Sequence, residues 1–484
     1  MILAFTSVQG FATNVQTEMI GTLSKQIQAP DQITTLTITG PIDASDLYFI
    51  GTQMTKLTSL NLEKATIEAY KDASLNGSTH YPANAIPPGA FAGSKLETIV
   101  LPAANKTTID NGAFMNSALK ALPLNIDSIG HAAFAGCENI VNLVLSDVKL
   151  GTDAFADCAN LKTVEFTDIT AVPARTFRGC TSLSTIIGGG NITVVGAQAF
   201  EGDIALTTFD FGANLIEIGQ RAFAGTGLQS VDLTNSPKIK TTGSQLFADS
   251  QIEHINLNAN TSDLPEGALF GNSKLTEITL PENLITIGSH AFTGTNLKNL
   301  SLPSNLEEIG DYALYGQSDI QNIELPSTVL YIGERAMGNM TGLKKIDATA
   351  LSSVPELGQD VWEGVDQPNV QLFVTYDYYN DFANAPQWKE FSIDNTTDAI
   401  DNVITMLGES GVKGRFVGYE LQIESASDII RRVNLYDLSG RALLTLDPQD
   451  TAAYIDTTDI PGSIFIINVV LDNNITASLK LARH

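Results

Sequence analysis

One large apolar residue recurs along most of this chain at nearly constant spacing. Successive members of the series are 20 to 25 residues apart, and the positions are Phe91, Phe114, Phe134, Phe155, Phe177, Phe200, Phe223, Phe247, Phe270, Phe292, Leu314, Met337 and Trp362. Internal repeats of about 20–29 residues are typical of solenoids, in which each short coil packs only on its neighbours. The period therefore predicts a repeat solenoid. It favours a function that depends on a long surface over one that depends on a catalytic pocket.

The residues between two members of the series follow a second pattern. In the repeat LITIGSHAFTGTNLKNLSL, which spans 284–302, Ile287 and Phe292 are expected to point into a common core, with a short turn at Gly288 between them. The following Leu297, Leu300 and Leu302 have the spacing L-x-x-L-x-L, which is typical of a short strand with inward apolar positions. We therefore expect leucine-rich repeats of about 22–23 residues. Their short β-strands should stack about 4.8 Å apart.

The charge balance restricts the classes of partner. Acidic residues outnumber basic ones 54 to 27 among 484 residues, which gives a net charge of −27. Such a surface repels phosphate backbones and anionic lipids, so we expect no nucleic-acid partner. The simplest interpretation is that the acidic excess keeps a long exposed solenoid in solution. No stretch of 18 or more apolar residues occurs, so no transmembrane helix is expected.

Composition shifts divide the chain into five parts. Residues 1–12 resemble the apolar tail of a signal peptide, although a basic segment before it is missing. Residues 13–80 are interpreted as an N-terminal capping module, 81–368 as the regular repeats, and 369–393 as an aromatic C-terminal cap. A polar break at 394–398 then leads to residues 394–484, which alternate apolar and polar positions as a small β-sandwich does.

The three cysteines occupy one slot in three consecutive repeats. Cys137, Cys158 and Cys180 each follow a member of the apolar series by three residues, where several other repeats carry Ser or Thr. Neither a histidine nor a second nearby cysteine completes a zinc or redox motif. We interpret them as small buried side chains of one repeat position. The sequence leaves open whether neighbouring coils bring two of them into a disulfide.

The repeat motif also resembles a known family. The pattern I-G-x-x-A-F-x-G-x-x-L-x-x-I-x-L-P, seen as IGSHAFTGTNLKNLSLP, resembles the BspA-like leucine-rich repeats of bacterial surface proteins, especially those of Bacteroidetes. The segment LFVTYDYYNDFANAPQWKEF looks like the C-terminal cap of that family, and the resemblance covers about residues 20 to 393. It implies a secreted or surface-exposed protein. Several such relatives are implicated in adhesion to host matrix proteins or to other bacteria.

Residues 433–484 resemble a second family. The segments VNLYDLSGRALLTL and YIDTTDIPGSIFIINVV look like the C-terminal sorting domain of the type IX secretion system. The ending SLKLARH departs from the lysine-bearing terminus of that family. The resemblance implies a small β-sandwich with a role in sorting or attachment.

No constellation of catalytic residues emerges from the chain. HExxH, GxSxG, the P-loop and the EF-hand loop are all missing from the sequence. His131 and His290 occupy variable slots before the apolar series, as expected of solvent-facing positions. We therefore expect no enzymatic activity, no catalytic or metal-binding residues and no cofactor.

Candidate ligand-binding residues come from the outward positions of the strands. The position between the last two inward residues of each strand should align along one face of the sheet, and it is occupied by Glu165, Asp210, Asp232, Asn256, Thr279, Ser301, Glu324 and Asp347. A merely solvated sheet face is the plainer interpretation. The alternative is a ligand-binding surface, for a basic protein segment or with Ca²⁺ held by neighbouring carboxylates.

The resulting hypothesis is a non-enzymatic, secreted or cell-surface protein that recognises a protein or glycan on a host matrix or a bacterial surface. One alternative is a glycan-capturing accessory protein, with Trp388 and the tyrosines Tyr376, Tyr378 and Tyr379 as an aromatic platform. A purely structural surface component is the other.

Overall fold

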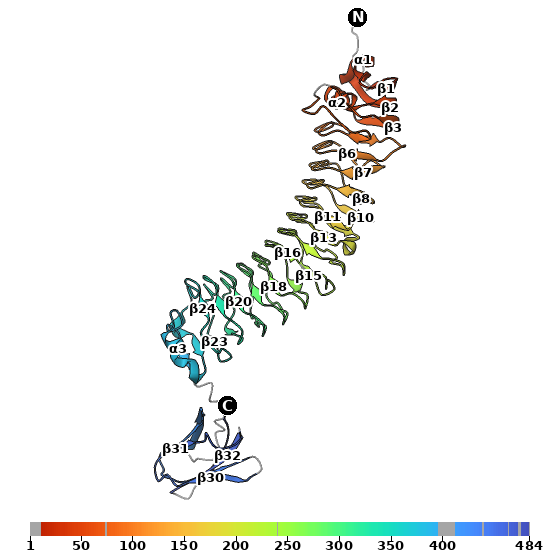
Figure 1. Ribbon diagram of the computed structural model, residues 1–484. Coiled ribbons are helices and arrows are strands. Elements are labelled where there is room, and N and C mark those ends of the chain that lie inside the picture. The colour runs from red at the N-terminus through yellow and green to blue at the C-terminus, as the bar shows by residue number, and fades with distance from the viewer. Residues whose placement is uncertain are drawn as a thin grey trace. The chain divides into compact units, whose positions relative to one another are not determined.

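The computed structural model of the chain describes residues 11–72, 75–239, 241–394, 412–437, 440–462, 464–472 and 476–483 (Figure 1). Residues 1–10 of the expected signal-like segment lie outside this description, and Phe11 and Ala12 begin the first strand. The chain divides into two units, one of residues 1–300 with 309–317, the other of residues 301–308 with 318–484. Each unit is described by itself.

The first unit is a β-solenoid in which most coils contribute a strand to a parallel face, named here the strand face. Its strands form three sheets in the orders β1-β2-β3-β5, β12-β10-β8 and β15-β17. The bounds are β1 (Phe11–Gln16), β2 (Ile33–Ile42), β3 (Ser59–Ile67), β5 (Thr98–Val100), β8 (Asn142–Leu145), β10 (Thr163–Phe166), β12 (Thr185–Ile187), β15 (Ser230–Asp232) and β17 (His254–Asn256). This arrangement confirms the predicted fold class of stacked short strands.

A second stack of shorter parallel strands lies just before the recurring apolar residue of each coil. Its sheets have the orders β4-β6-β7-β9 and β11-β13-β14-β16, and β18 pairs with β19. The strands are β4 (Ala85–Ile86), β6 (Thr107–Ile109), β7 (Ile126–Ile129), β9 (Lys149–Leu150), β11 (Ala171–Val172), β13 (Val194–Val195), β14 (Glu217–Ile218), β16 (Thr241–Thr242), β18 (Asp263–Leu264) and β19 (Thr286–Ile287). A 3-10 turn, η2 (Gly189–Asn191), follows β12.

The beginning of the first unit contains its α-helices, α1 (Leu23–Gln26) and α2 (Ala44–Gln53), and the 3-10 turn η1 (Pro30–Gln32). Helix α2 starts at a capping box, because Asp43 accepts from Ser45 N and Asp46 N while Asp46 accepts from Asp43 N. Asp46 also accepts the backbone N–H groups of Gly21 and Leu23. These bonds tie α1 to α2 at this end of the solenoid.

The recurring apolar residues form a continuous core column. The rings from Phe91 to Phe247 stack coil on coil, with centroids 5.3–5.8 Å apart. One predicted member is wrong: Phe270 is 36% exposed, and Leu269 is fully buried in the slot. Leu269 directly follows Ala268, and most phenylalanines of the column also follow an alanine, the exceptions being Phe177 after Thr176 and Phe247 after Leu246. The motif A-F-x-G therefore aligns with A-L-F-G in this coil.

Two left-handed corners flank the core column. The residue two positions after it has positive φ in every coil of the first unit and is always Gly, Asn or Asp, as at Asn116, Gly179 and Asp249. The residue two positions before it also has positive φ, but there the chain accepts large side chains such as Arg221 and His290. The backbone path is therefore the same in each coil, while the side chain at the corner before the core column differs in size and charge from coil to coil.

Glycines four residues before the core column serve close stacking. A Cβ at Gly219 would lie 2.4 Å from the backbone nitrogen of Ala197 in the preceding coil, and at Gly288 it would lie 2.6 Å from Glu266 N. The expected turn at Gly288 is therefore explained by contact between coils, since its φ is not in the positive range. These glycines allow the backbones of adjacent coils to approach each other.

The second unit continues the repeats, which are followed by the segment 369–394 and then by the strands from residue 412 onward. A parallel sheet has the order β21-β23-β25-β26, and β22 pairs with β24. The elements are β21 (Asn322–Glu324), β22 (Tyr331–Ile332), β23 (Lys345–Asp347), β24 (Glu356–Leu357), β25 (Gln371–Phe373), β26 (Ser392–Asp394), η3 (Gln367–Asn369), η4 (Tyr376–Tyr378) and α3 (Tyr379–Asn384). Strand β20 (Glu308–Ile309) lies where the two units meet in the sequence.

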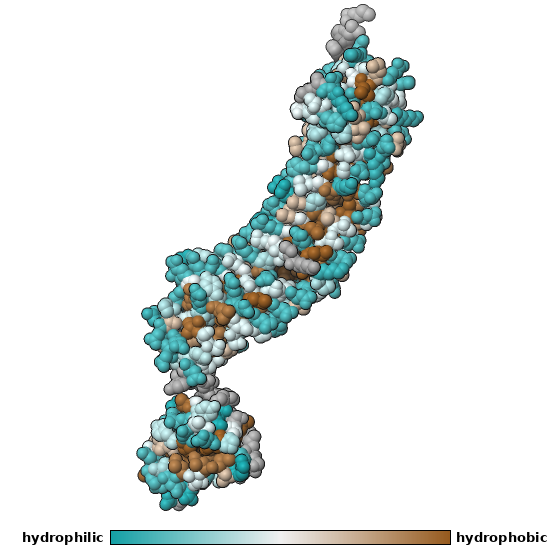
Figure 2. Space-filling model, viewed as in Figure 1, coloured by the Kyte–Doolittle hydropathy of each residue, from teal (hydrophilic) through white to brown (hydrophobic). Residues whose placement is uncertain are grey.

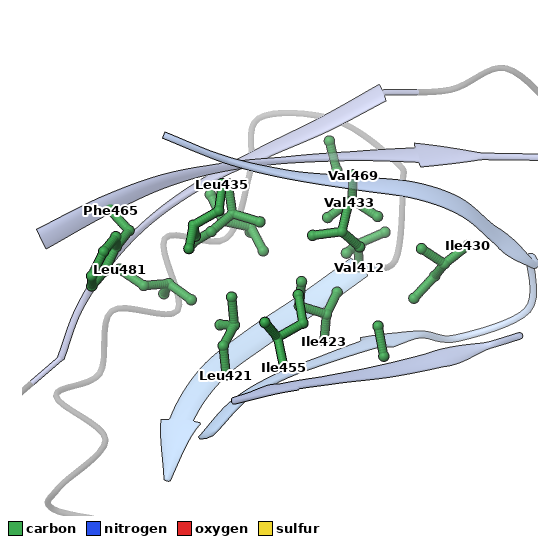
Figure 3. Packing of buried hydrophobic residues seen from close by; sticks show 14 of the residues in the cluster. Val412, Leu421, Ile423, Ile430, Val433, Leu435, Ile455, Phe465, Val469 and Leu481 are labelled. Atoms are coloured by element: carbon green, nitrogen blue, oxygen red, sulfur yellow. The ribbon is translucent and has the colours of Figure 1, made fainter. Parts of the chain in front are cut away.

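Residues from 412 onward form an antiparallel β-sandwich. Its two sheets have the orders β27-β28-β31 and β30-β29-β32-β33. The strands are β27 (Val412–Val417), β28 (Glu420–Ser425), β29 (Ile430–Tyr436), β30 (Ala442–Leu446), β31 (Ala452–Asp456), β32 (Ile464–Leu471) and β33 (Thr476–Ala482). Alternating residues such as Leu421, Val433 and Phe465 point between the sheets and form one core (Figure 3).

Candidate functional site

The predicted site residues occupy one outward position of successive coils, and we call this set of positions the outward column. Five of the eight lie in strands, namely Glu165 in β10, Asp232 in β15, Asn256 in β17, Glu324 in β21 and Asp347 in β23. Asp210, Thr279 and Ser301 lie outside the strands, and all three are exposed. The structure thus places the predicted residues at the surface.

In the first unit the strand register brings three of these residues together. Asp232 is the register partner of Asn256, and Asn256 forms a bridge with Thr279. The Asp232 carboxylate accepts Thr234 Oγ1 at 2.6 Å and Thr234 N at 2.9 Å. These hydrogen bonds lower the pKa of Asp232, so its carboxylate stays ionised on the strand face.

Glu165 has different neighbours from those expected. Its register partners are Val144 in β8 and Ile187 in β12, whose side chains are 63% and 49% exposed. The register therefore flanks Glu165 with two outward apolar residues, while Asp210 lies further along the chain in an exposed segment. The outward column is not uniformly polar in its first part.

In the second unit, Glu324 and Asp347 are register partners. Burial alone would raise the pKa of Asp347. Hydrogen bonds from Thr349 Oγ1 at 2.6 Å and from the backbone of Thr349, together with Lys345 Nζ at 3.1 Å, outweigh this effect and lower it. Lys345 Nζ also lies 4.6 Å from the ring centroid of Phe373, which is the register partner of Asp347 in the next strand, β25. Two neighbouring acidic groups and an aromatic ring thus share this surface.

Sequence reasoning missed an apolar part of the strand face. Val100, Leu124, Val144 and Ile187 are 47%, 88%, 63% and 49% exposed. Residues of high hydropathy form brown patches on the face that Figure 2 shows. In the sequence, this apolar part is visible as an apolar residue at the outward position of β5, β8 and β12. The predicted site residues were all polar, so the prediction did not include it.

The three cysteine thiols belong to a buried column that satisfies carbonyl groups. Cys137, Cys158 and Cys180 are free thiols, and their Sγ atoms donate to the carbonyls of Phe114, Phe134 and Phe155 at 3.1–3.2 Å. Burial raises the pKa of the Cys137 thiol to about 11, so it remains a protonated donor. This agrees with their interpretation as small buried side chains.

The same column contains polar members that the sequence analysis did not identify. Asn272 and Gln317 donate their amides to the carbonyls of Phe247 and Phe292 at 2.8 and 2.7 Å. Asp203 also occupies this column, fully buried, and neither of its carboxyl oxygens has a hydrogen-bond partner. Desolvation raises the pKa of Asp203 well above its ordinary value.

The proposed aromatic platform in the cap is wrong for Trp388. This side chain is only 1% exposed and packs against Trp362, Phe382 and Phe391 with centroids 5.0–6.1 Å apart among these rings. Tyr378 and Tyr379 are half-buried, and the side chain of Tyr376 lies outside the description. Trp388 therefore packs on Trp362, the last member of the apolar series, and its ring is not accessible to a glycan.

Within the described parts of the chain, no group of three or more His, Cys, Asp or Glu residues has a geometry suited to a metal ion. Across those same residues, no helix is both long and apolar enough to cross a membrane.

Comparison with known proteins gives one family. The model of the BspA type leucine rich repeat region matches residues 84–207, 148–270, 193–321 and 307–404, which together cover more than half of the chain. Proteins with this solenoid fold are typically non-enzymatic. No curated protein matches the chain.

Several solved structures are similar to it. A leucine-rich repeat protein from Bacteroides ovatus is 23% identical over 67% of this chain and 87% of its own, with a TM-score of 0.47. A leucine rich cell surface protein from Faecalibacterium prausnitzii is 17% identical over 59% of this chain and 85% of its own, with a TM-score of 0.35. A leucine-rich repeat protein from Eubacterium ventriosum is 15% identical over 69% and 84%, with a TM-score of 0.36.

Proposed function

Since this chain belongs to the BspA-type leucine-rich repeat family, we propose that it is a secreted or cell-surface recognition protein whose outward column binds a protein on a host matrix or a bacterial surface. The observation that carries this proposal is the outward acidic residues within each unit: Glu165, Asp210 and Asp232 in the first, and Glu324 and Asp347 in the second, of which Glu165 and Asp347 are half-buried and the others exposed. No catalytic step is needed for this function.

The chemistry of the outward column favours a basic partner. The ionised carboxylates of Asp232 and Asp347 are held in fixed orientations by Thr234 and Thr349, so they are already oriented before a partner arrives. Acidic groups on a partly exposed surface steer basic partners and determine their register, and this effect weakens as salt increases. A basic protein segment is therefore the ligand class that fits the column.

We further propose that residues 394–484 act as a sorting or attachment domain. Support comes from the resemblance of residues 433–484 to the type IX secretion sorting domain and from their place in a separate antiparallel sandwich. Truncation before Val412 in the producing cell, followed by fractionation, should leave the repeats inside the cell. Unchanged export of the truncated chain would contradict this role.

The recognition proposal is tested by a binding array. The purified full chain is applied to matrix glycoproteins, bacterial surface fractions and glycans at low and high salt. We expect saturable binding to a protein, weakened by salt. Binding to glycans alone would favour a glycan-capturing accessory protein. A blank array together with self-association of the chain would favour a structural surface component.

A further inference from the structure

A hollow of about 440 Å³ opens beside the apolar part of the strand face. It is lined by residues 121–126 of one coil and by residues 142–146 of the next, with Lys106, Ile129 and Val148 completing it. Both the inward Leu143 and the outward Val144 of β8 line it, so it runs along the side of that strand, where a neighbouring strand would lie. Its volume is within the range of pockets that bind small ligands or single side chains.

The hollow exists because one coil fails to form its strand. Phe114 and Phe134 are 20 residues apart, the shortest interval in the series, and Pro123 stands where β5 has its outward Val100. Proline has no N–H group for the ladder. Pro123 is buried instead, and Leu124, whose equivalent directly after β5 is the buried Leu101, is 88% exposed. This one-residue shift turns an inward leucine to the surface.

The same break leaves a strand edge open. The first sheet ends at β5, and the next begins at β8, which pairs with β10 alone among the strands that the structure describes. An open edge of this kind offers backbone hydrogen bonds to an added extended segment. The exposed Leu124 and Val144 lie on either side of the gap and provide apolar contact for one large side chain.

The charged residues near the hollow indicate which charge a ligand that extends beyond it should carry. Lys106, the one charged residue in its lining, is already paired with Asp147 at 2.7 Å. Glu165 is the register partner of Val144, so its backbone lies one strand further along the strand face, at a spacing of about 4.8 Å. Asp210 and Asp232 follow on later coils. The surface is thus apolar at the hollow and carries acidic groups further along the outward column, with the exposed Ile187 between Glu165 and Asp210.

We propose that the hollow binds the apolar anchor of an extended protein segment, whose adjoining basic residues lie over Glu165, Asp210 and Asp232. The segment joins the open edge of β8 at the hollow and continues along the outward column. This inference rests on the proposed recognition function and specifies the chemistry of the partner. The segment combines one or two large apolar side chains with a following run of Lys or Arg.

The test uses the full chain and two fluorescent synthetic peptides. One carries two phenylalanines, a two-glycine spacer and four alternating lysines. The other replaces both phenylalanines by serine. Leu124→Asp places a charge in the hollow at a side chain that is 88% exposed, so the fold should be retained. Leu330→Asp is the matched control, because Leu330 is 60% exposed in the second unit. Far-ultraviolet circular dichroism and thermal unfolding verify the fold of each variant.

We expect the phenylalanine peptide to bind the unmodified chain at least tenfold more tightly than the serine peptide. Leu124→Asp should abolish this difference, whereas Leu330→Asp should preserve it. Absence of saturable binding by the phenylalanine peptide, or equal affinity of both peptides for the unmodified chain, would overturn the proposal. So would an undiminished preference in Leu124→Asp.

The double variant Asp210→Lys/Asp232→Lys separates this inference from the recognition proposal. If it weakens both peptides while Leu124→Asp weakens neither, the acidic column binds basic segments and the hollow plays no part. If neither change affects any peptide and the binding array is blank, both proposals fail.

Discussion

Inward and outward residues of the same strands differ in how closely one coil resembles the next. Leu143, Val164 and Val231 point inward from β8, β10 and β15, and all three are buried aliphatic side chains. Directly after each of them, the outward column carries Val144, Glu165 and Asp232, which are apolar or acidic. Packing between coils restricts the first set, whereas the second set is exposed or half-buried at the surface and is restricted much less. Recognition can therefore vary along the outward column without cost to the fold.

The largest expected effect comes from the core column. Phe177→Ala removes a fully buried ring that stacks between Phe155 and Phe200, with centroids 5.7 and 5.5 Å away. We expect a loss of about 3–5 kcal/mol in unfolding free energy, measured by urea denaturation. A loss below about 1 kcal/mol would show that the stacked rings do not determine the stability of the solenoid.

A glycine between coils comes next. Gly219→Ala places a methyl group 2.4 Å from Ala197 N, so the two coils must move apart. Overpacking of this kind should cost about 1–3 kcal/mol. The control is Ala132→Gly, since Ala132 has φ of 52° at a left-handed corner and glycine adopts that conformation without strain. Stability of this control should be unchanged or slightly higher, and equal losses in both variants would contradict the role of close coil approach.

Asp203→Asn should stabilise the chain. Asp203 occupies the same buried repeat position as the three cysteines and Asn272. The side-chain amide of Asn272 donates a hydrogen bond to the carbonyl of Phe247 in the preceding coil at 2.8 Å, whereas the carboxyl oxygens of Asp203 have no hydrogen-bond partner. Satisfying the buried group should add about 1–3 kcal/mol at neutral pH.

The gain from Asp203→Asn should depend on pH. The pKa of Asp203 is raised in the folded state, so the proton is held more tightly there than in the unfolded chain. Ionisation therefore destabilises the fold progressively as pH rises above the unfolded pKa of about 3.9, until the folded pKa is passed. Thermal unfolding of both proteins from pH 4 to pH 8 should show a stability difference that widens with pH. A constant difference would contradict the assignment.

The smallest effect is expected on the strand face. Thr185→Ser changes an exposed side chain of β12 and should alter stability by less than about 0.5 kcal/mol. A larger loss, seen in the same urea denaturation, would show that outward residues contribute to packing and would weaken the contrast between the two sets.

The repeat fold could be predicted from the sequence because the same pattern of apolar residues and glycines recurs in successive coils. The period, the inward leucines and the glycine before A-F all report contact between neighbouring coils, and these contacts recur. The exceptions were harder. Phe270 matched the period, but the core position of this coil is occupied by Leu269, and an interval that varies from 20 to 25 residues cannot distinguish two adjacent apolar residues.

The candidate site was only partly predictable. Alternation identified Asp232 and Asn256 as neighbours on the surface, and the register brings them together. The hollow beside β8 lies where a strand does not form. The only signs of it in the sequence are Pro123 and the short interval between Phe114 and Phe134. Burial of Trp388 depends on how the cap folds over the last coil, which composition alone does not specify.

The most direct test measures binding and unfolding on the same pair of proteins. The unmodified chain and Asp210→Lys/Asp232→Lys are each titrated, at low salt, with the phenylalanine–lysine peptide and then unfolded by urea. We predict at least a tenfold weaker affinity for the double variant and a loss of unfolding free energy below about 1 kcal/mol, since the only hydrogen bonds described for the two carboxylates are those from Thr234 to Asp232. Equal affinities, or a stability loss as large as that of Phe177→Ala, would contradict the claim that the inward residues build this solenoid and the outward column recognises its partner.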